Sequence, residues 1–352
     1  MAVQRTGNAD NRSWLEIVAR YQRPDTTRAV WQLVTTLLPL MVSFAIMYRL
    51  LTVSFWWTLL PAIPTAGLLV RTFILMHDCA HGSFVGSRRA NHLVGAVTGL
   101  LTLTPFDQWR HEHALHHASA GDLGRRGHGD VDTLTVREYC ARTTWGRLRY
   151  RLVRHPAIFL GLGPLFFLLE QRVPPHGPAA GRRQIMSVWG TNAAIIAVGA
   201  GLALLVGMRA VLLLYLPVYY LALASGILLF FVQHQFEDTY WEEHERWSYL
   251  DAAIAGSSYF RLPAVLRWFT GNIGLHHVHH LGPRIPNYNL QRCHDENSLF
   301  HRVTIVTLAQ SLRSVRLALW DEDAGRLVGI RDAQRVADRD GIRDSEREAA
   351  RR

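Results

Sequence analysis

Four long apolar runs constrain the fold of this chain more than any other feature of its sequence. They occupy about residues 30–51, 53–76, 185–206 and 211–232. Each has about the 20 residues that an α-helix needs to cross the hydrocarbon core of a bilayer. Buried helices of soluble proteins are rarely so long and so uniformly apolar. Since 49% of the chain is hydrophobic and 19% charged, we expect an all-α integral membrane protein with four transmembrane helices.

The formal net charge is +10, and the basic residues are arginines. These arginines flank the apolar runs and do not form one patch interleaved with aromatic residues, which argues against a nucleic-acid partner. They are frequent before the first run, after the second and before the third, whereas the two tight outer turns hold only Arg49 and Arg209. By the positive-inside rule, both chain ends should be cytoplasmic.

The rest of the sequence suggests one membrane domain with a cytoplasmic cap. Residues 1–29 form a cytoplasmic or interfacial leader, in which residues 14–21 are amphipathic. Residues 30–320 form the single domain. Residues 321–352 form a C-terminal tail that is mostly charged with alternating signs, and we expect its final residues to be a solvated helix or disordered. Three scattered cysteines give no disulfide framework.

Three further segments lie between the second and third runs. Residues 91–105 are apolar but too short for an ordinary span, so we expect a re-entrant or surface helix. Residues 121–132 are rich in glycine and charge and should form a cytoplasmic loop. Residues 156–169 are again short and apolar, and we place them at the membrane interface.

Histidines gather in three short clusters, and one more ends the fourth run. A single histidine is usually a hydrogen-bonded core residue, but residues three and four apart share a helix face, so each cluster can aim its rings together. Imidazole nitrogen binds divalent transition metals. On the expected topology, every cluster lies at the cytoplasmic side. The nine candidate metal ligands are His77, His81, His113, His116, His117, His234, His276, His279 and His280.

Nine candidates are too many for one metal ion, so we expect two. The Glu-x-x-His pairs of soluble di-iron proteins are absent, and His111-Glu112 is followed by His113, which does not match the zinc-protease pattern. A nitrogen-ligated pair of irons would suit oxygen-dependent removal of hydrogen from an unactivated C–H bond, which side chains cannot perform alone.

Three motifs, HDCAH at 77–81, HALHH at 113–117 and HHVHH at 276–280, resemble the three histidine boxes of the membrane fatty-acid desaturase family. The flanking segments VQHQFEDTYWE at 232–242, GSSYFRLP at 256–263 and GNIGLHHVHHLGPRIPNYNL at 271–290 are similar to bacterial acyl-lipid desaturases, including delta-5 and delta-12 (omega-6) enzymes. The resemblance extends over roughly residues 20–335.

The resemblance implies four transmembrane helices with a mainly helical cytoplasmic cap that holds a histidine-ligated di-iron centre. The eight box ligands fall on the clustered histidines above, and the isolated ninth falls on His234. His111 and His277 lie outside the box positions, so they are second-shell or incidental. Asp78, Glu112 and Glu237 are carboxylates that could orient ligating rings.

The implied function is oxygen-dependent introduction of a cis double bond into the acyl chain of a membrane lipid, using two Fe²⁺ ions on the cytoplasmic side of a bacterial cytoplasmic membrane. The chain has no flavin fingerprint and no cysteine set for an iron–sulfur cluster, so a ferredoxin or other small carrier must supply electrons. Arg125, Arg126 and the arginines between 142 and 154 would suit an acidic donor.

Two alternatives stay open at this point. A related di-iron lipid or carotenoid hydroxylase or ketolase would share the metal, fold and donor, and would differ in placing oxygen in the product. A histidine-rich membrane metal carrier or sensor would need polar groups along its spans, and the first, third and fourth runs have few.

Overall fold

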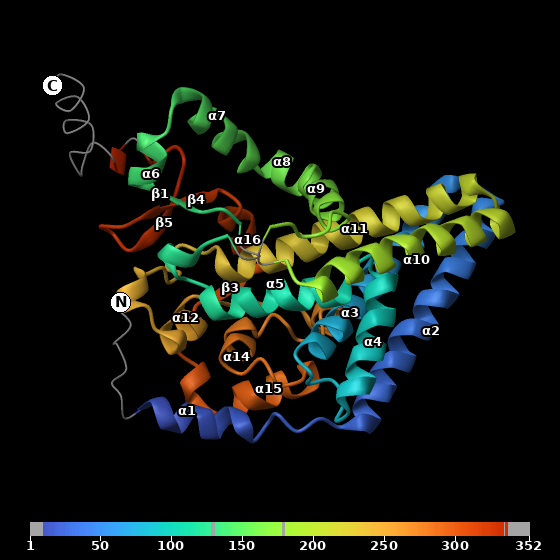
Figure 1. Cartoon of the computed structure of the whole chain (residues 1–352), viewed down its shortest axis with the longest axis horizontal. Coiled ribbons are helices and arrows are strands. Elements are labelled where there is room, and N and C mark those ends of the chain that lie inside the picture. Colours follow the sequence, from blue (N-terminus) through green and yellow to red (C-terminus); the bar gives the residue numbers. More distant parts are fainter. Residues whose placement is uncertain (1–9, 128–130, 178–179, 334, 337–352) are drawn as a thin grey trace.

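The computed structural model describes residues 10–127, 131–177, 180–333 and 335–336. Two hairpins of long helices dominate it (Figure 1). The first pairs α2 (Thr26–Leu51) with α3 (Phe55–Ala80), and the second pairs α10 (Arg182–Val206) with α11 (Met208–His234). Asp25 caps α2 by accepting from the backbone N–H of Arg28 at 3.0 Å. Gly207 joins α10 to α11 at φ +84°, a backbone conformation that glycine adopts without strain.

In the described part of the chain, these four helices are long and apolar enough to cross a membrane, which confirms the expected fold class. Each begins or ends within a few residues of the expected run. In the most apolar part of α10, only 6% of the residues are buried inside the protein, whereas 61% of the corresponding residues of α3 are buried. The spans therefore leave α10 largely exposed to lipid, while α3 packs against α2, α4 and α11 and forms the centre of the bundle.

A mainly helical cap covers one end of the bundle, as expected (Figure 1). Its first part contains α4 (Arg88–Leu101) and α5 (Phe106–Ser119). Helix α4 includes most of the short apolar segment at 91–105, for which a re-entrant or surface helix was expected. Gly95 allows close packing there, because an added Cβ would lie 2.3 Å from the ring of Phe106. The other helices of this part are η1 (Leu123–Arg125), α6 (Val136–Ala141), α7 (Thr144–Val153), α8 (Pro156–Gly161) and α9 (Gly163–Glu170).

The second part of the cap follows α11 along the chain. It contains η2 (His244–Arg246), α12 (Tyr249–Ala255), α13 (Ala264–Phe269), α14 (His276–Leu281), α15 (Asn287–Glu296), η3 (Ser298–Phe300) and α16 (Leu308–Ser314). The helix α1 (Asp10–Ala19) of the leader packs on this part, where Val18 is buried in the same apolar core as Leu281. The hydroxyl of Tyr21 donates to Glu296 at 2.6 Å, so the leader is fastened to the cap.

Two small sheets complete the cap, and one of them includes the start of the expected C-terminal tail. Strands β1 (Leu134–Thr135), β4 (Leu317–Asp321) and β5 (Arg326–Gly329) form one sheet, and β2 (Tyr259–Arg261) pairs in parallel with β3 (Ile305–Thr307). The first residues of the expected charged tail belong to the cap, because Leu327 is buried and β5 pairs with β4. The sequence around this strand is mostly charged, so its short apolar pair, Leu327 and Val328, did not indicate a strand. Residues 337–352 lie outside the described part.

Candidate metal centre

The first two histidines come from the end of the central span. His77 lies in the last turn of α3, and His81 caps that helix. Because they are four residues apart, their rings project from one face, with centroids 4.8 Å apart. Span α3 thus delivers both rings to the boundary between the bundle and the cap.

The second cluster lies on α5, which packs against α3 and α10. His113 and His117 are one turn apart, and their Nε2 atoms lie 3.1 Å from each other. The indole of Trp109, one turn earlier, stacks on His113 with ring centroids 4.3 Å apart. His116 points elsewhere, and its Nε2 lies 3.2 Å from Nε2 of His234 at the end of α11.

The third cluster forms most of the short helix α14, which is entirely buried. The turn just before α14 sets the direction in which this helix begins. Asn272 adopts φ +58°, and Gly274 approaches β2 so closely that an added Cβ would lie 2.4 Å from the carbonyl oxygen of Phe260. The Nε2 atom of His276 lies 3.0 Å from that of His234, and Nε2 of His279 lies 3.0 Å from that of His117.

The structure brings all nine sequence-predicted histidines together in two groups. One group contains His77, His81, His113, His117 and His279, and the other contains His116, His234, His276 and His280. Within each group, the potential ligand atoms lie within 4.8 Å of one another. The two groups consist of histidines alone, so each offers a pocket of nitrogen ligands.

Adjacent histidines are divided between the groups. His116 and His117 are neighbours on α5 but belong to different groups, and so do His279 and His280 on α14. Successive residues of an α-helix point about 100° apart, so one helix can serve two sites with a His-His pair. The residues four apart, His113 with His117 and His276 with His280, stay in the same group.

The arrangement fits a metal ion in each group. Nitrogen ligands about 2.1 Å from one ion, at tetrahedral or octahedral angles, lie about 3.0–3.4 Å apart. The Nε2 separations of 3.0, 3.1 and 3.2 Å match that spacing. Buried polar atoms normally have partners, yet the buried Nε2 atoms of His81 and His280 have no hydrogen-bond partner among the described residues. A bound cation would satisfy both nitrogens.

Protonation states also suit a metal. Burial, followed by the charge of neighbouring imidazoles, lowers the pKa of His81, His117, His279 and His280 well below the usual histidine value. These rings are therefore neutral near pH 7 and keep a nitrogen lone pair for ligation. His234 is oriented by a hydrogen bond between its Nδ1 and the carbonyl oxygen of Gly256, at 3.1 Å, which leaves Nε2 facing the site.

Of the other expected site residues, Asp78 is well placed. It is buried, and its Oδ2 accepts from the backbone N–H and the side-chain amide of Asn287 at 2.7 and 2.9 Å. Its other oxygen lies 3.4 Å from Nδ1 of His77. Asn287 also exchanges hydrogen bonds with Gln32 of α2, at 2.8 and 3.1 Å. Sequence reasoning missed Asn287 and Gln32, although the NYNL motif at 287–290 marked the first of them.

The remaining four expected residues lie in different surroundings. Glu112 accepts from Gln108 at 3.2 Å, and His111 is exposed. Glu237 has a side chain that is 61% exposed and pairs with Arg326 at 3.1 Å, an open position that does not suit the orientation of a buried ring. His277 is fully buried, but its Nε2 lies 3.2 Å from Nδ1 of His294 and it belongs to neither group.

The expected basic surface for an electron donor is divided in the structure. Arg126 pairs with Glu138 at 2.5 Å, and Arg125 pairs with Asp122 at 2.6 Å. Arg154 is buried and donates to the carbonyl oxygen of Leu317 at 2.8 Å. These three arginines therefore have structural partners within the cap, whereas Arg149 on α7 is exposed.

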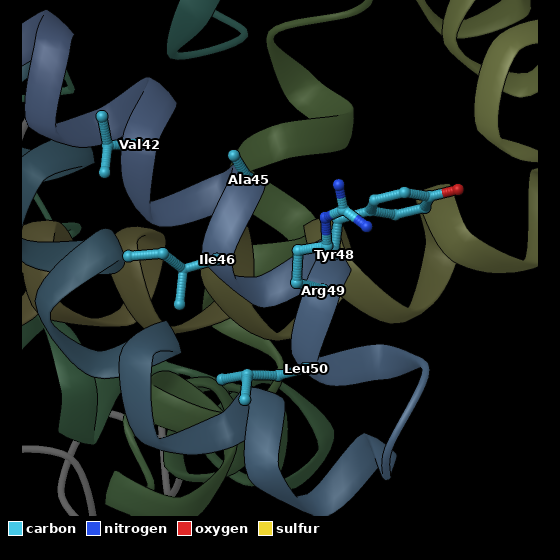
Figure 2. Close-up of a pocket in the computed structure, with 6 residues that line it drawn as sticks. All are labelled: Val42, Ala45, Ile46, Tyr48, Arg49 and Leu50. Carbon is cyan, nitrogen blue, oxygen red and sulfur yellow. The ribbon is translucent and has the colours of Figure 1, made fainter.

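A shallow recess on α2 is unrelated to the histidines. Figure 2 shows it along the C-terminal half of that span, lined by Val42, Ala45, Ile46, Tyr48, Arg49 and Leu50. Val42 and Ile46 are exposed on the outer surface of the bundle. The recess is therefore part of the lipid-facing surface.

Comparisons with known proteins identify the family to which this chain belongs. The sequence model of the fatty acid desaturase family matches residues 54–305, which include all nine histidines. A fatty acid desaturase of Bacillus subtilis is 42% identical over 320 residues, covering 91% of this chain and 90% of that protein. The chain belongs to the fatty acid desaturase family. This desaturase is accordingly an oxidoreductase that acts on lipid acyl chains, and its family together with its four long apolar helices indicates a membrane protein.

More distant relatives carry more specific names. An sn-1 oleoyl-lipid 12-desaturase of Synechocystis is 26% identical over 245 residues, covering 68% of each chain. An sn-2 acyl-lipid omega-3 desaturase (ferredoxin) of Helianthus annuus is 28% identical over 238 residues, covering 62% of this desaturase and 50% of that protein. Family membership favours desaturation over the hydroxylase, ketolase and metal-carrier alternatives.

Proposed function

We propose that the nine histidines of this desaturase hold two iron ions, one in each group. The observation that carries the proposal is the pair of buried, nitrogen-only groups at the cap end of the spans. Zinc binds histidine but has no redox chemistry, whereas iron bound there would supply oxygen activation for the removal of two hydrogens from an acyl chain. The assignment of His77, His81, His113, His117 and His279 to one ion and His116, His234, His276 and His280 to the other follows the geometry.

The protein's own groups position this centre and keep it dry. All nine histidines except His81 are buried. They lie on or at the ends of helices α3, α5, α11 and α14. Asp78, fixed by Asn287, holds the end of α3, and the Gly256 carbonyl holds His234. We propose that Asp78 is the one effective carboxylate support among those expected, and that His111, Glu112, Glu237 and His277 are not ligands.

For the substrate, we propose the acyl chain of an intact membrane lipid, in which a cis double bond is formed. The names of the Synechocystis and Helianthus annuus relatives support this choice, since they denote an oleoyl-lipid and an acyl-lipid desaturase. The location of the histidines at the ends of membrane-spanning helices also supports it, because an acyl chain in the bilayer can then reach the site without leaving the membrane.

The distribution of arginines supports an orientation of the protein in the membrane, and the name of the Helianthus annuus relative supports an electron source. Arg20 and Arg23 precede α2 and Arg28 lies in its first turn, at the end of that span nearest the histidines, so we propose that the cap is in the cytoplasm of a bacterial cell. The name of the Helianthus annuus relative includes ferredoxin. We propose that a ferredoxin or another small carrier delivers two electrons to the cap for each double bond.

Expression in a host that lacks polyunsaturated lipids tests the proposal. Intact lipids are analysed by mass spectrometry with localisation of double bonds, and acyl thioesters are analysed in parallel. A loss of two hydrogens that appears first in phospholipid supports an acyl-lipid substrate. A product that appears first in the thioester pool would overturn that part, and a product heavier by one oxygen would overturn desaturation as the main reaction.

A further inference from the structure

Helix α7 (Thr144–Val153) has one face fixed to the cap. Tyr150 is buried, and its hydroxyl accepts from the backbone N–H of Leu134 at 3.2 Å and donates to the carbonyl oxygen of Ala318. These two residues belong to neighbouring strands β1 and β4. The side of α7 that carries Tyr150 is therefore the inner side.

The opposite side of α7 is apolar and exposed. Trp145, Leu148 and Leu152 are 72%, 43% and 48% exposed. At 100° per residue, these side chains fall within about 60° of one another and lie on the far side of the helix from Tyr150. A stripe of three large apolar side chains pointing away from the protein is unusual in contact with water.

Arginines border this stripe. Arg149 lies on one side of it and Arg142 lies just before the helix, and both are exposed. Arg151, on the other side, is also exposed, and its Nε donates to the hydroxyl of Tyr139. No acidic residue occurs from residue 142 to 154. An apolar stripe bordered by basic side chains is the pattern of helices that lie in the interface of an anionic membrane.

The stripe is continuous with surface that faces the membrane. Figure 1 shows α7, α8 and α9 as one arm that runs from the side of α11 toward α6. The arm is tied to span α11, because the hydroxyl of Tyr220 donates to the carbonyl oxygen of Gly161 at 3.2 Å and the rings of Phe159 and Phe231 lie 4.7 Å apart. Further along the arm, Phe166 and Leu169 are also exposed.

We propose that α7 lies in the headgroup layer of the membrane, with its apolar stripe inserted and its arginines bound to the phosphates of anionic phospholipids. The arginines of α7 then serve the membrane, and an acidic electron carrier docks on another part of the cap. Large apolar side chains between the arginines favour lipid over a soluble acidic protein, because a lipid surface accepts both the apolar stripe and the charges.

Hydrogen–deuterium exchange on the full chain tests this. The protein is placed in nanodiscs of phosphatidylcholine alone and of phosphatidylcholine mixed with phosphatidylglycerol, and the amides of residues 144–153 are followed. Each arginine near an anionic surface strengthens docking about fivefold. We expect exchange of α7 to slow several-fold in the anionic nanodiscs. The double variant Arg142→Glu/Arg149→Glu should lose that protection, and Trp145→Ser/Leu148→Ser should lose it as well.

The variant Arg302→Glu is the matched control, since Arg302 is an exposed arginine of the cap outside α7. It should keep the wild-type protection. Equal exchange of α7 in the two kinds of nanodisc would overturn the proposal. Protection by added ferredoxin, without protection by anionic lipid, would overturn it in favour of a donor-binding role.

Discussion

Asp78 and Asn287 are 209 positions apart in the sequence, and they are joined by two hydrogen bonds of 2.7 and 2.9 Å in the buried boundary between the central span and the cap. Asn287 also contacts Gln32 on α2. One side chain thus connects the first span, the first histidine box and the helix that follows the third box. Groups that orient metal ligands in this way influence metal affinity about 10–100-fold.

Replacement of Asn287 by alanine should therefore weaken metal binding and lower activity together. The change removes the side-chain amide that donates to the buried Asp78 carboxylate and contacts Gln32, and leaves only the backbone N–H of residue 287 as a donor. A buried charge that loses a hydrogen bond is destabilised. We expect a 10–100-fold loss of iron affinity, measured by chelator competition on the purified protein. Asn289→Ala is the control, because Asn289 on the same helix donates to the carbonyl oxygen of Tyr21. Equal iron retention in the two variants would contradict the role of Asn287.

Replacement of a histidine should separate proposed ligands from bystanders. His81→Ala and His280→Ala each remove a buried nitrogen that has no protein partner in the described structure, and both should lose iron and desaturation. His111→Ala alters an exposed ring and should keep both. Elemental analysis and lipid mass spectrometry on the same preparations provide the measurement. Full iron content in His280→Ala would remove it from the ligand set.

The metal-depleted protein should lose stability as the pH falls. In the folded state, the pKa values of His117, His279 and His280 are lowered mainly by burial, so these rings stay neutral while the unfolded chain binds protons below about pH 6.5. The unfolded state then gains protons that the folded state does not. Each such histidine lowers the free energy of unfolding by about 1.4 kcal/mol per pH unit below that value.

Thermal unfolding in detergent between pH 8 and pH 5 checks this dependence. The curve should be flat above about pH 7 and fall below about pH 6.5. Iron loading should raise the melting temperature across this range and leave the onset of the fall near pH 6.5, because the fall comes from proton uptake by the unfolded chain. A melting temperature that does not change across this range in the metal-depleted protein would contradict the burial of neutral rings.

The β4–β5 hairpin should contribute to the stability of the cap. Leu327 is 1% exposed, and its N–H donates to the carbonyl oxygen of Glu237 at 2.9 Å. Leu327→Ala should lower the free energy of unfolding by about 2–5 kcal/mol. Arg326→Gln removes only the surface pair with Glu237 and should cost about 1 kcal/mol or less. Denaturation monitored by proteolysis of the cap compares the two, and equal effects would show that the hairpin is not part of the core.

The spans and the nine histidines could be predicted because each signal is local. Length and hydropathy define a span, and spacing of three or four defines a helix face. The Asp78–Asn287 pair could not be found in this way, since no local pattern relates residues so far apart. The β5 strand was missed because the burial of Leu327 depends on β4 and on the Glu237 backbone, whereas its sequence neighbours are charged.

The two His-His pairs have a consequence for how the centre assembles and fails. Because α5 and α14 each contribute at least one ring to both groups, movement of either helix would alter both proposed metal sites. A small rotation of α14 would move His279 and His280 together, each within its own group. Metal binding in one group should therefore position the ligands of the other group. A substitution that displaces α5 or α14 should weaken metal binding in both groups.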